Sequence, residues 1–150
     1  MRLLNMTIAV ASICGTAAAE QKGLPLKDLP AVVQNAIREN LHGGEIRNIG
    51  KEKEDGIEQY EVESLLNGKS RDFNVDMKGR LLVVEEATVI DAIPSVARAS
   101  ILERVGDGKL TSVETVTRPG QPTTYEAAYT DRKGKKHEAR FKPDGTETKQ

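Results

Sequence analysis

The sequence predicts an α+β protein in which two tandem repeats, each one helix followed by four antiparallel strands (α-β4), form a single sheet with both helices packed on one face. Two observations carry this prediction. Segments with helical spacing of apolar residues are followed by segments in which apolar and polar residues alternate. The whole pattern then occurs a second time, about 65 residues further along the chain.

The repeat is visible as matched short segments. Leu29-Pro30-Ala31-Val32 corresponds to Ile93-Pro94-Ser95-Val96, and Tyr60-Glu61-Val62 corresponds to Tyr125-Glu126-Ala127. These matches assign residues 20–28 to a short N-terminal extension, 29–91 to the first repeat and 92–150 to the second. One copy of about 60 residues buries little surface by itself. We therefore expect both copies to pack as one unit around one core.

Each repeat opens with a helix whose apolar residues share a face. Pro30 and Pro94 fall in the first helical turn, where a missing N–H costs no hydrogen bond. Glycines end both helices, because their backbone tolerates the conformation that follows a helix. The apolar faces consist of Val32, Val33, Ala36, Ile37 and Leu41 in the first copy and Val96, Ala97, Ser100, Ile101 and Val105 in the second.

After each helix the pattern alternates with a period of two, as in half-buried antiparallel strands. Residues 81–84 are apolar throughout and predict a central strand that links the copies. The first strand of each copy spaces its apolar residues by three, which indicates either a β-bulge or a strand that starts late. All aromatic residues fall on inner positions of the strands: Tyr60, Phe73, Tyr125, Tyr129 and Phe141.

Residues 1–19 have the order of a secretory signal peptide. A positive start at Arg2 precedes a mostly apolar run to Cys14, and Ala17-Ala18-Ala19 supplies a small-residue cleavage site. We expect cleavage after Ala19 and a periplasmic or secreted protein, with no transmembrane segment in the mature chain. Ile13 directly before Cys14 fits a lipoprotein signal poorly. The mature chain contains no cysteine, so it must fold without disulfides.

Residues suited to catalysis are few. His42 lies at a predicted helix end, where a cation is favourable, and His137 lies on an inner strand position that corresponds to Arg71. No metal-binding spacing, nucleophile elbow or phosphate loop is present, so we expect no catalytic residue, no metal site, no cofactor and no enzyme activity. A weaker alternative is an enzyme with a buried polar cavity near His137. The net charge of −1 gives no reason to expect nucleic-acid binding.

Charge separates along the sequence. Residues 20–91 hold 10 Lys and Arg against 15 Asp and Glu, whereas residues 92–150 hold 11 against 8. The outer face of the sheet should therefore be acidic at one end and basic at the other. This is either ordinary solvation of an exposed face or a docking surface with complementary charge. The candidate partner-binding residues are Glu54 and Asp55 at a hairpin tip and, on the strands, Glu61, Glu63, Asp72, Asp76, Lys136, Arg140 and Lys142.

The repeated unit, its Leu-Pro or Ile-Pro helix start, and the turns Asn67-Gly68-Lys69 and Lys133-Gly134-Lys135 resemble the PepSY-like family and its β-lactamase-inhibitor-like relatives. The resemblance covers about residues 26–150 and implies tandem helix and four-strand repeats. It also implies export by bacteria and restraint of a peptidase or another target. In the inhibitor-like relatives the open sheet face and a hairpin loop bind the target. Such loops would correspond to residues 54–56 and 119–122 here.

From these observations we expect an exported, non-enzymatic module that binds a protein or peptide in the cell envelope, as a monomer or weak dimer. The alternative is a periplasmic protein that binds a small ligand or a divalent cation, through the cleft between the copies or the acidic first half.

Overall fold

The computed structural model describes residues 23–148 of the chain. The predicted signal peptide, its cleavage site and Cys14 lie outside the described residues. Among the described residues no helix is both long enough and apolar enough to cross a membrane.

Helices and strands follow one another in the predicted order. The short 3-10 helix η1 (Leu26–Asp28) leads into α1 (Ala31–Asn40), and four strands follow: β1 (Glu45–Glu54), β2 (Ile57–Leu66), β3 (Lys69–Asp76) and β4 (Leu81–Thr88). A second 3-10 helix, η2 (Ile90–Ala92), then leads into α2 (Ser95–Val105). Four further strands complete the described chain: β5 (Lys109–Thr117), β6 (Thr124–Thr130), β7 (Lys136–Phe141) and β8 (Glu147–Thr148).

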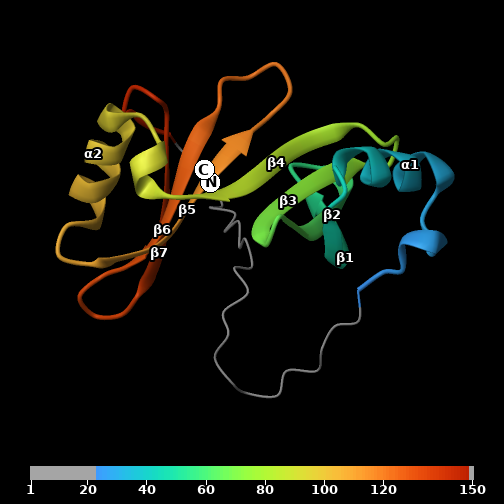
Figure 1. Ribbon diagram of the computed structural model, residues 1–150, viewed down its shortest axis with the longest axis horizontal. Helices are drawn as coiled ribbons and strands as arrows, with labels where there is room; N and C mark the ends of the chain where they lie inside the picture. The colour runs from blue at the N-terminus through green and yellow to red at the C-terminus, as the bar shows by residue number, and fades with distance from the viewer. Residues whose placement is uncertain (1–22, 149–150) are drawn as a thin grey trace.

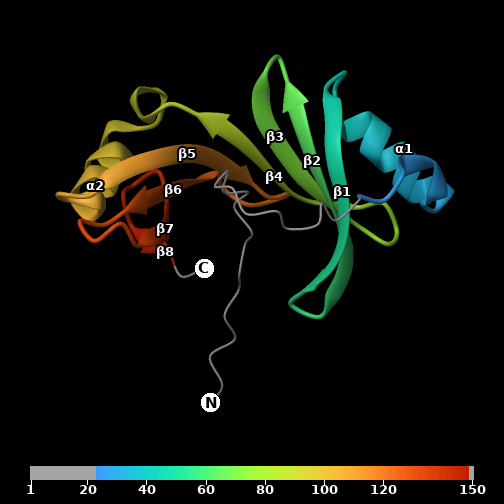
Figure 2. The same ribbon diagram turned by 90° about the horizontal axis from the view of Figure 1, so that it is seen from below.

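The strands form one eight-stranded antiparallel sheet in the order of the sequence. The sheet curves strongly, and the two helices lie on its outer side near opposite ends (Figures 1 and 2). Strand β4 joins the halves, because it pairs with β3 on one side and with β5 on the other. The predicted α+β class, single sheet and linking strand are confirmed.

Register shows that both helices cover the same face. Val62, Phe73 and Val84 lie opposite one another on β2, β3 and β4, and all three belong to the cluster under α1. Val84 pairs with Thr117, which shares its side of β5 with Val113, and Val113 belongs to the cluster under α2. The opposite side of the sheet, here called the open face, carries no helix.

The single core expected from the sequence is wrong. Except for Val83 and Val116, the buried apolar residues form two clusters, one under each helix. Between them the helix-bearing face carries Glu86, Thr115 and Thr117 on the paired strands β4 and β5. Glu86 and Thr117 are exposed, because neither helix reaches this polar seam. The halves therefore share a sheet but not a core.

The structure decides between two alternatives that the sequence left open, and it confirms one local prediction. The register shifts between Ile46 and Asn48 on β1 and between Leu110 and Ser112 on β5, so the three-residue spacing marks a β-bulge in both strands. The aromatic rings lie on the helix-bearing side, and all except that of Tyr125 belong to buried residues. The open face therefore carries no aromatic ring in residues 23–148, although the buried Val83 and Val116 lie on it.

Each helix rests on a glycine of a β-hairpin. Gly79, at the β3–β4 turn, would place a Cβ 2.8 Å from the carbonyl oxygen of Val32 on α1. Gly145, at the β7–β8 turn, would place one 3.2 Å from the carbonyl oxygen of Val96 on α2. Both also have positive φ, so no other residue fits these turns without strain. Pro30 and Pro94 stand at the N-caps, one position before the helices begin.

Candidate functional site

The open face of the sheet is lined with carboxylates. Strand alternation turns Glu61 and Glu63 of β2 and Asp72 of β3 away from α1, because their neighbours Val62 and Phe73 are buried beneath that helix. The same alternation brings carboxylates of β4 to β7 to this side through the pairs Glu114–Glu126 and Glu126–Arg140. We call these residues the acidic face: Glu61, Glu63, Asp72, Glu85, Glu114, Glu126 and Glu138.

Crowding of these carboxylates changes their titration. Partial burial raises the pKa of Glu61 from 4.5 to about 7, and repulsion from Glu52 and Glu63 acts in the same direction. Partial burial also raises the pKa of Glu85 to about 7, helped by Glu126 and opposed by Arg140. The pKa values of Asp72, Glu114 and Glu138 are raised as well, in each case chiefly by burial. Cations from outside the chain would relieve this repulsion.

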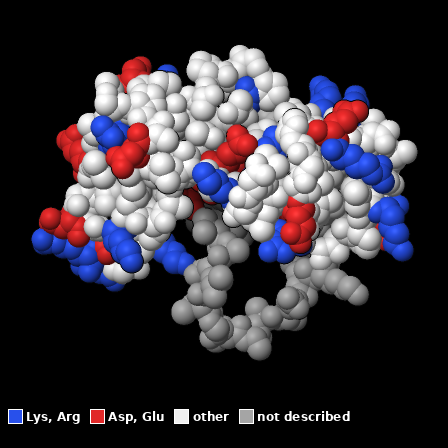
Figure 3. Space-filling view, viewed as in Figure 1, with Lys and Arg blue, Asp and Glu red and all other residues white. Residues whose placement is uncertain are grey.

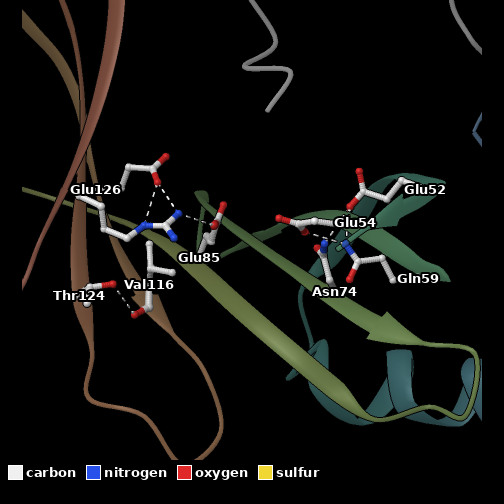
Figure 4. Close-up of polar contacts among 9 residues, drawn as sticks. Glu52, Glu54, Gln59, Asn74, Glu85, Val116, Thr124 and Glu126 are labelled. Carbon is white, nitrogen blue, oxygen red and sulfur yellow. Dashed lines mark hydrogen bonds and ion pairs between the residues drawn. The ribbon is translucent and has the colours of Figure 1, made fainter. Parts of the chain in front are cut away.

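Arg140 is the cation at the centre of this face, and it is not free. Its Nε and Nη2 donate to Glu126 Oε2 at 3.1 and 2.5 Å, and Nη2 lies 3.8 Å from Glu85 Oε1 (Figure 4). Both members of the Arg140–Glu126 pair have side chains only 8% exposed. Arg140 therefore holds β6 and β7 together, and these contacts leave only Nη1 of its guanidinium for a partner.

The predicted division into an acidic and a basic end is wrong. Glu114, Glu126 and Glu138 extend the carboxylates well into the second half of the sheet. In Figure 3 both signs of charge mix at the two ends of the molecule. Lys136 and Lys142 are exposed as expected, but they lie at the margin of an acidic surface. Sequence composition missed this because it counts charges along the chain, whereas the sheet sets them side by side.

Asp76 is also misassigned as a candidate contact. The residue is only 3% exposed, and its carboxylate accepts hydrogen bonds from the backbone N–H groups of Lys78 and Arg80 and from Arg80 Nε. Burial acts to raise the pKa of Asp76, but these hydrogen bonds outweigh it and lower the pKa. Asp131 binds the N–H groups of Lys133 and Lys135 in the same way. Asp76 is a turn-forming residue.

At the β1–β2 end, a buried amide organises the margin of the open face. Gln59 is 3% exposed, and its Nε2 donates to Glu52 Oε1 at 2.7 Å and to Glu54 Oε2 at 2.9 Å. Asn74 of β3 donates to the same Glu52 oxygen at 3.0 Å, so four side chains converge (Figure 4). Glu54 is thus held in place, while Asp55 is exposed at the turn. The alternation of apolar and polar residues predicts the side of the sheet on which Gln59 lies, but it does not predict these hydrogen-bond partners.

The two histidines lie in different surroundings. His42 is exposed after the end of α1. His137 stacks on Tyr129 with ring centroids 5.3 Å apart and lies 3.0 Å from Asp131 Oδ2, with its side chain 31% exposed. Arg71, its counterpart in the sequence, is buried, bonds Glu86 and lies over the Phe73 ring. Within residues 23–148, no three His, Asp or Glu side chains are grouped to hold a metal ion.

The same fold occurs in solved structures from Bacteroides. A protein of Bacteroides eggerthii, provisionally described as periplasmic, aligns with a TM-score of 0.67 at 15% identity over 81% of this chain and 86% of that one. A DUF2874 family protein of Bacteroides ovatus gives 0.64 at 14% identity over 81% and 85%. A BLIP-like protein of Bacteroides fragilis gives 0.61 at 19% identity over 84% and 85%.

At these identities the likeness concerns the fold alone. No family model matches the chain, and no curated protein matches it at the sequence level. The resemblance to PepSY-like proteins therefore stays a prediction.

Proposed function

We propose that this chain is an exported bacterial, non-enzymatic module whose open face docks a protein or peptide in the cell envelope. The observation that carries the proposal is the acidic face itself. One side of a curved sheet is left without a helix and carries carboxylates on six neighbouring strands. Arg140 forms ion pairs with two of them, Glu85 and Glu126.

Charge complementarity selects the kind of surface that fits. Raised pKa values show that the carboxylates are more crowded and less hydrated than isolated ones, so the folded chain carries an unfavourable electrostatic energy. Lys and Arg side chains on a partner would lower this energy and would also steer the encounter. The partner's contact surface is therefore basic over most of its area. A peptidase or sensor of the envelope is the class of target implied by the PepSY-like resemblance.

Export and duplication belong to the same proposal. Residues 1–19 act as a cleaved signal peptide, and the mature chain works in the periplasm or outside the cell as a monomer or weak dimer. Tandem duplication is supported by paired details that have no reason to coincide otherwise. The β-bulges of β1 and β5 correspond, and so do the helix contacts of Gly79 and Gly145.

The test is capture of partners from an envelope extract by the purified protein. Glu61→Lys with Glu63→Lys reverses charge on the acidic face, and Glu39→Lys with Glu103→Lys makes the same change on exposed helix positions. We expect the first pair to lose a partner that the wild type and the second pair retain. If both double variants retain the partner, the proposed docking face is wrong. N-terminal sequencing of the protein from the periplasmic fraction tests cleavage after Ala19.

A further inference from the structure

A hollow of about 660 Å³ opens beside the acidic face, at the end of the sheet where the β5–β6 and β7–β8 hairpins project. Val116 and Thr124 lie in it from the paired ends of β5 and β6, and Arg140 lies in it from β7. The loop after β5 contributes Arg118 and Pro122, and the chain after β7 contributes Lys142. The volume falls in the range of sites that hold small organic groups.

Cationic nitrogens dominate this lining. Arg118 and Lys142 form no ion pair in the described part of the chain, although Arg118 lies close enough to Glu85 to lower its pKa. The acid in the lining is Asp144, whose Oδ1 already accepts the backbone N–H of Thr146 at 2.9 Å. Lys142 lies close enough to Asp144 to lower the pKa of that carboxyl, so the three cationic side chains Arg118, Arg140 and Lys142 face a space with one carboxylate of its own.

Arg140 adds a buried donor to the same space. Its Nε and Nη2 are taken by Glu126, which leaves Nη1 without a hydrogen-bond partner in residues 23–148. Every side-chain nitrogen in that range that is sealed from solvent has a hydrogen-bond partner. Because Nη1 has no partner, it must keep some solvent-accessible surface. The guanidinium is held rigidly by its other two nitrogens and is only 8% exposed. A fixed donor of this kind suits an anionic oxygen.

The rest of the lining determines the size and polarity of the ligand. Val116, Pro122 and Pro143 supply apolar surface beside the cations. The hydroxyl groups of Thr124 and Thr148 donate to backbone carbonyl oxygens, so their oxygen lone pairs remain available to accept a hydrogen bond from a ligand. A carboxylate joined to a compact apolar group matches this mixture, with its two oxygens on the cations and its side chain against the prolines.

We propose that this hollow binds the terminal carboxylate of a peptide or protein chain, with the last side chain against Val116 and Pro122. This inference rests on the proposed docking function and names one end of the docked partner. The basic residues of that partner lie over the acidic face, and its C-terminus lies between the two hairpins.

The test is a titration of the purified protein followed by the backbone amide resonances in NMR. The probes are N-acetyl-Ala-Ala-Leu as the free acid, the same peptide as its C-terminal amide, and N-acetyl-Ala-Glu-Ala amide, which carries its only carboxylate on a side chain. We expect the free acid to shift resonances of Val116, Thr124 and Lys142. Both amides should bind roughly tenfold more weakly or worse, as expected for loss of charged hydrogen bonds.

Arg118→Gln and Lys142→Gln should each weaken free-acid binding by about tenfold. Lys133→Gln, an exposed cation on the β6–β7 loop, is the matched control and should change nothing. Equal response to the acid and its amide, tighter binding of the Glu-containing peptide, or no response to any probe would overturn the inference. An envelope partner that is lost with Glu61→Lys and Glu63→Lys but kept by Arg118→Gln and Lys142→Gln would overturn it while leaving the docking function intact.

Discussion

Replacing Arg140 with Met tests whether the buried ion pair is structural. The substitution keeps most of the side-chain volume but leaves the Glu126 carboxylate, 7% exposed at residue level, without its cation. Breaking a buried pair from one side costs about 3–5 kcal/mol, mainly because a charge stays buried and unpaired. Since Glu126 retains slight access to solvent, we expect the free energy of unfolding to fall by about 3 kcal/mol.

The measurement is urea denaturation at pH 7, followed by circular dichroism. Arg104→Met is the matched control, because its pair with Glu147 spans 3.5 Å and Arg104 is half exposed. An exposed pair of this kind contributes about 0–1 kcal/mol. The double variant Arg140→Met with Glu126→Leu removes both charges and should recover much of the loss. A loss below about 1 kcal/mol for Arg140→Met, or no recovery in the double variant, would refute the reasoning.

Three further predictions concern the acidic face and the turns. The pKa of Glu61 is raised to about 7 on folding, so its carboxyl stabilises the fold below pH 4.5 and this contribution is lost as the pH rises through about 7. Glu61→Gln should therefore flatten the decline in the free energy of unfolding, measured with urea, between pH 5 and pH 8. An unchanged slope would contradict this. Gly79→Ala should lower the free energy of unfolding by more than about 2 kcal/mol, because strain at positive φ adds to a clash with α1. Gly134→Ala introduces the strain alone and should cost about 1–2 kcal/mol. Equal losses of stability in thermal melting would argue against the helix contact. Asp76→Ala removes three hydrogen bonds made by a buried carboxylate and should lower the free energy of unfolding by about 2–3 kcal/mol, as measured by urea denaturation. Asp131→Ala should cost clearly less, because Asp131 is more exposed.

Periodicity was sufficient for the architecture. Apolar spacing places Val62 and Phe73 under a helix, whereas the three-residue interval at Ile46 and Ile49 left a β-bulge and a late strand start open until the register shift decided for the β-bulge. These features are local, because each depends on which side of a strand a residue occupies. The fold class and the face of the sheet that carries the candidate site follow from that one property.

Partners across strands were harder to predict. Arg140 has the alternation of an exposed residue, yet it is buried because Glu126 of β6 lies directly opposite it. Asp76 shows the same failure, although here a signal existed. An aspartate three residues before a turn glycine occurs at both Asp76 and Asp131, and it marks a carboxylate used by its own turn. The division into two cores depends on which part of the sheet each helix covers. The periodicity of the strands carries no information about the positions of the helices.

The polar seam on β4 and β5 has a consequence for how the two halves are joined. On the helix-bearing side no apolar cluster of residues 23–148 crosses the seam, whereas on the open face Arg140 of the second half lies 3.8 Å from Glu85 of β4. The backbone hydrogen bonds between β4 and β5 therefore join two halves that each pack around a core of their own. A substitution that opens one core should leave the apolar contacts of the other intact.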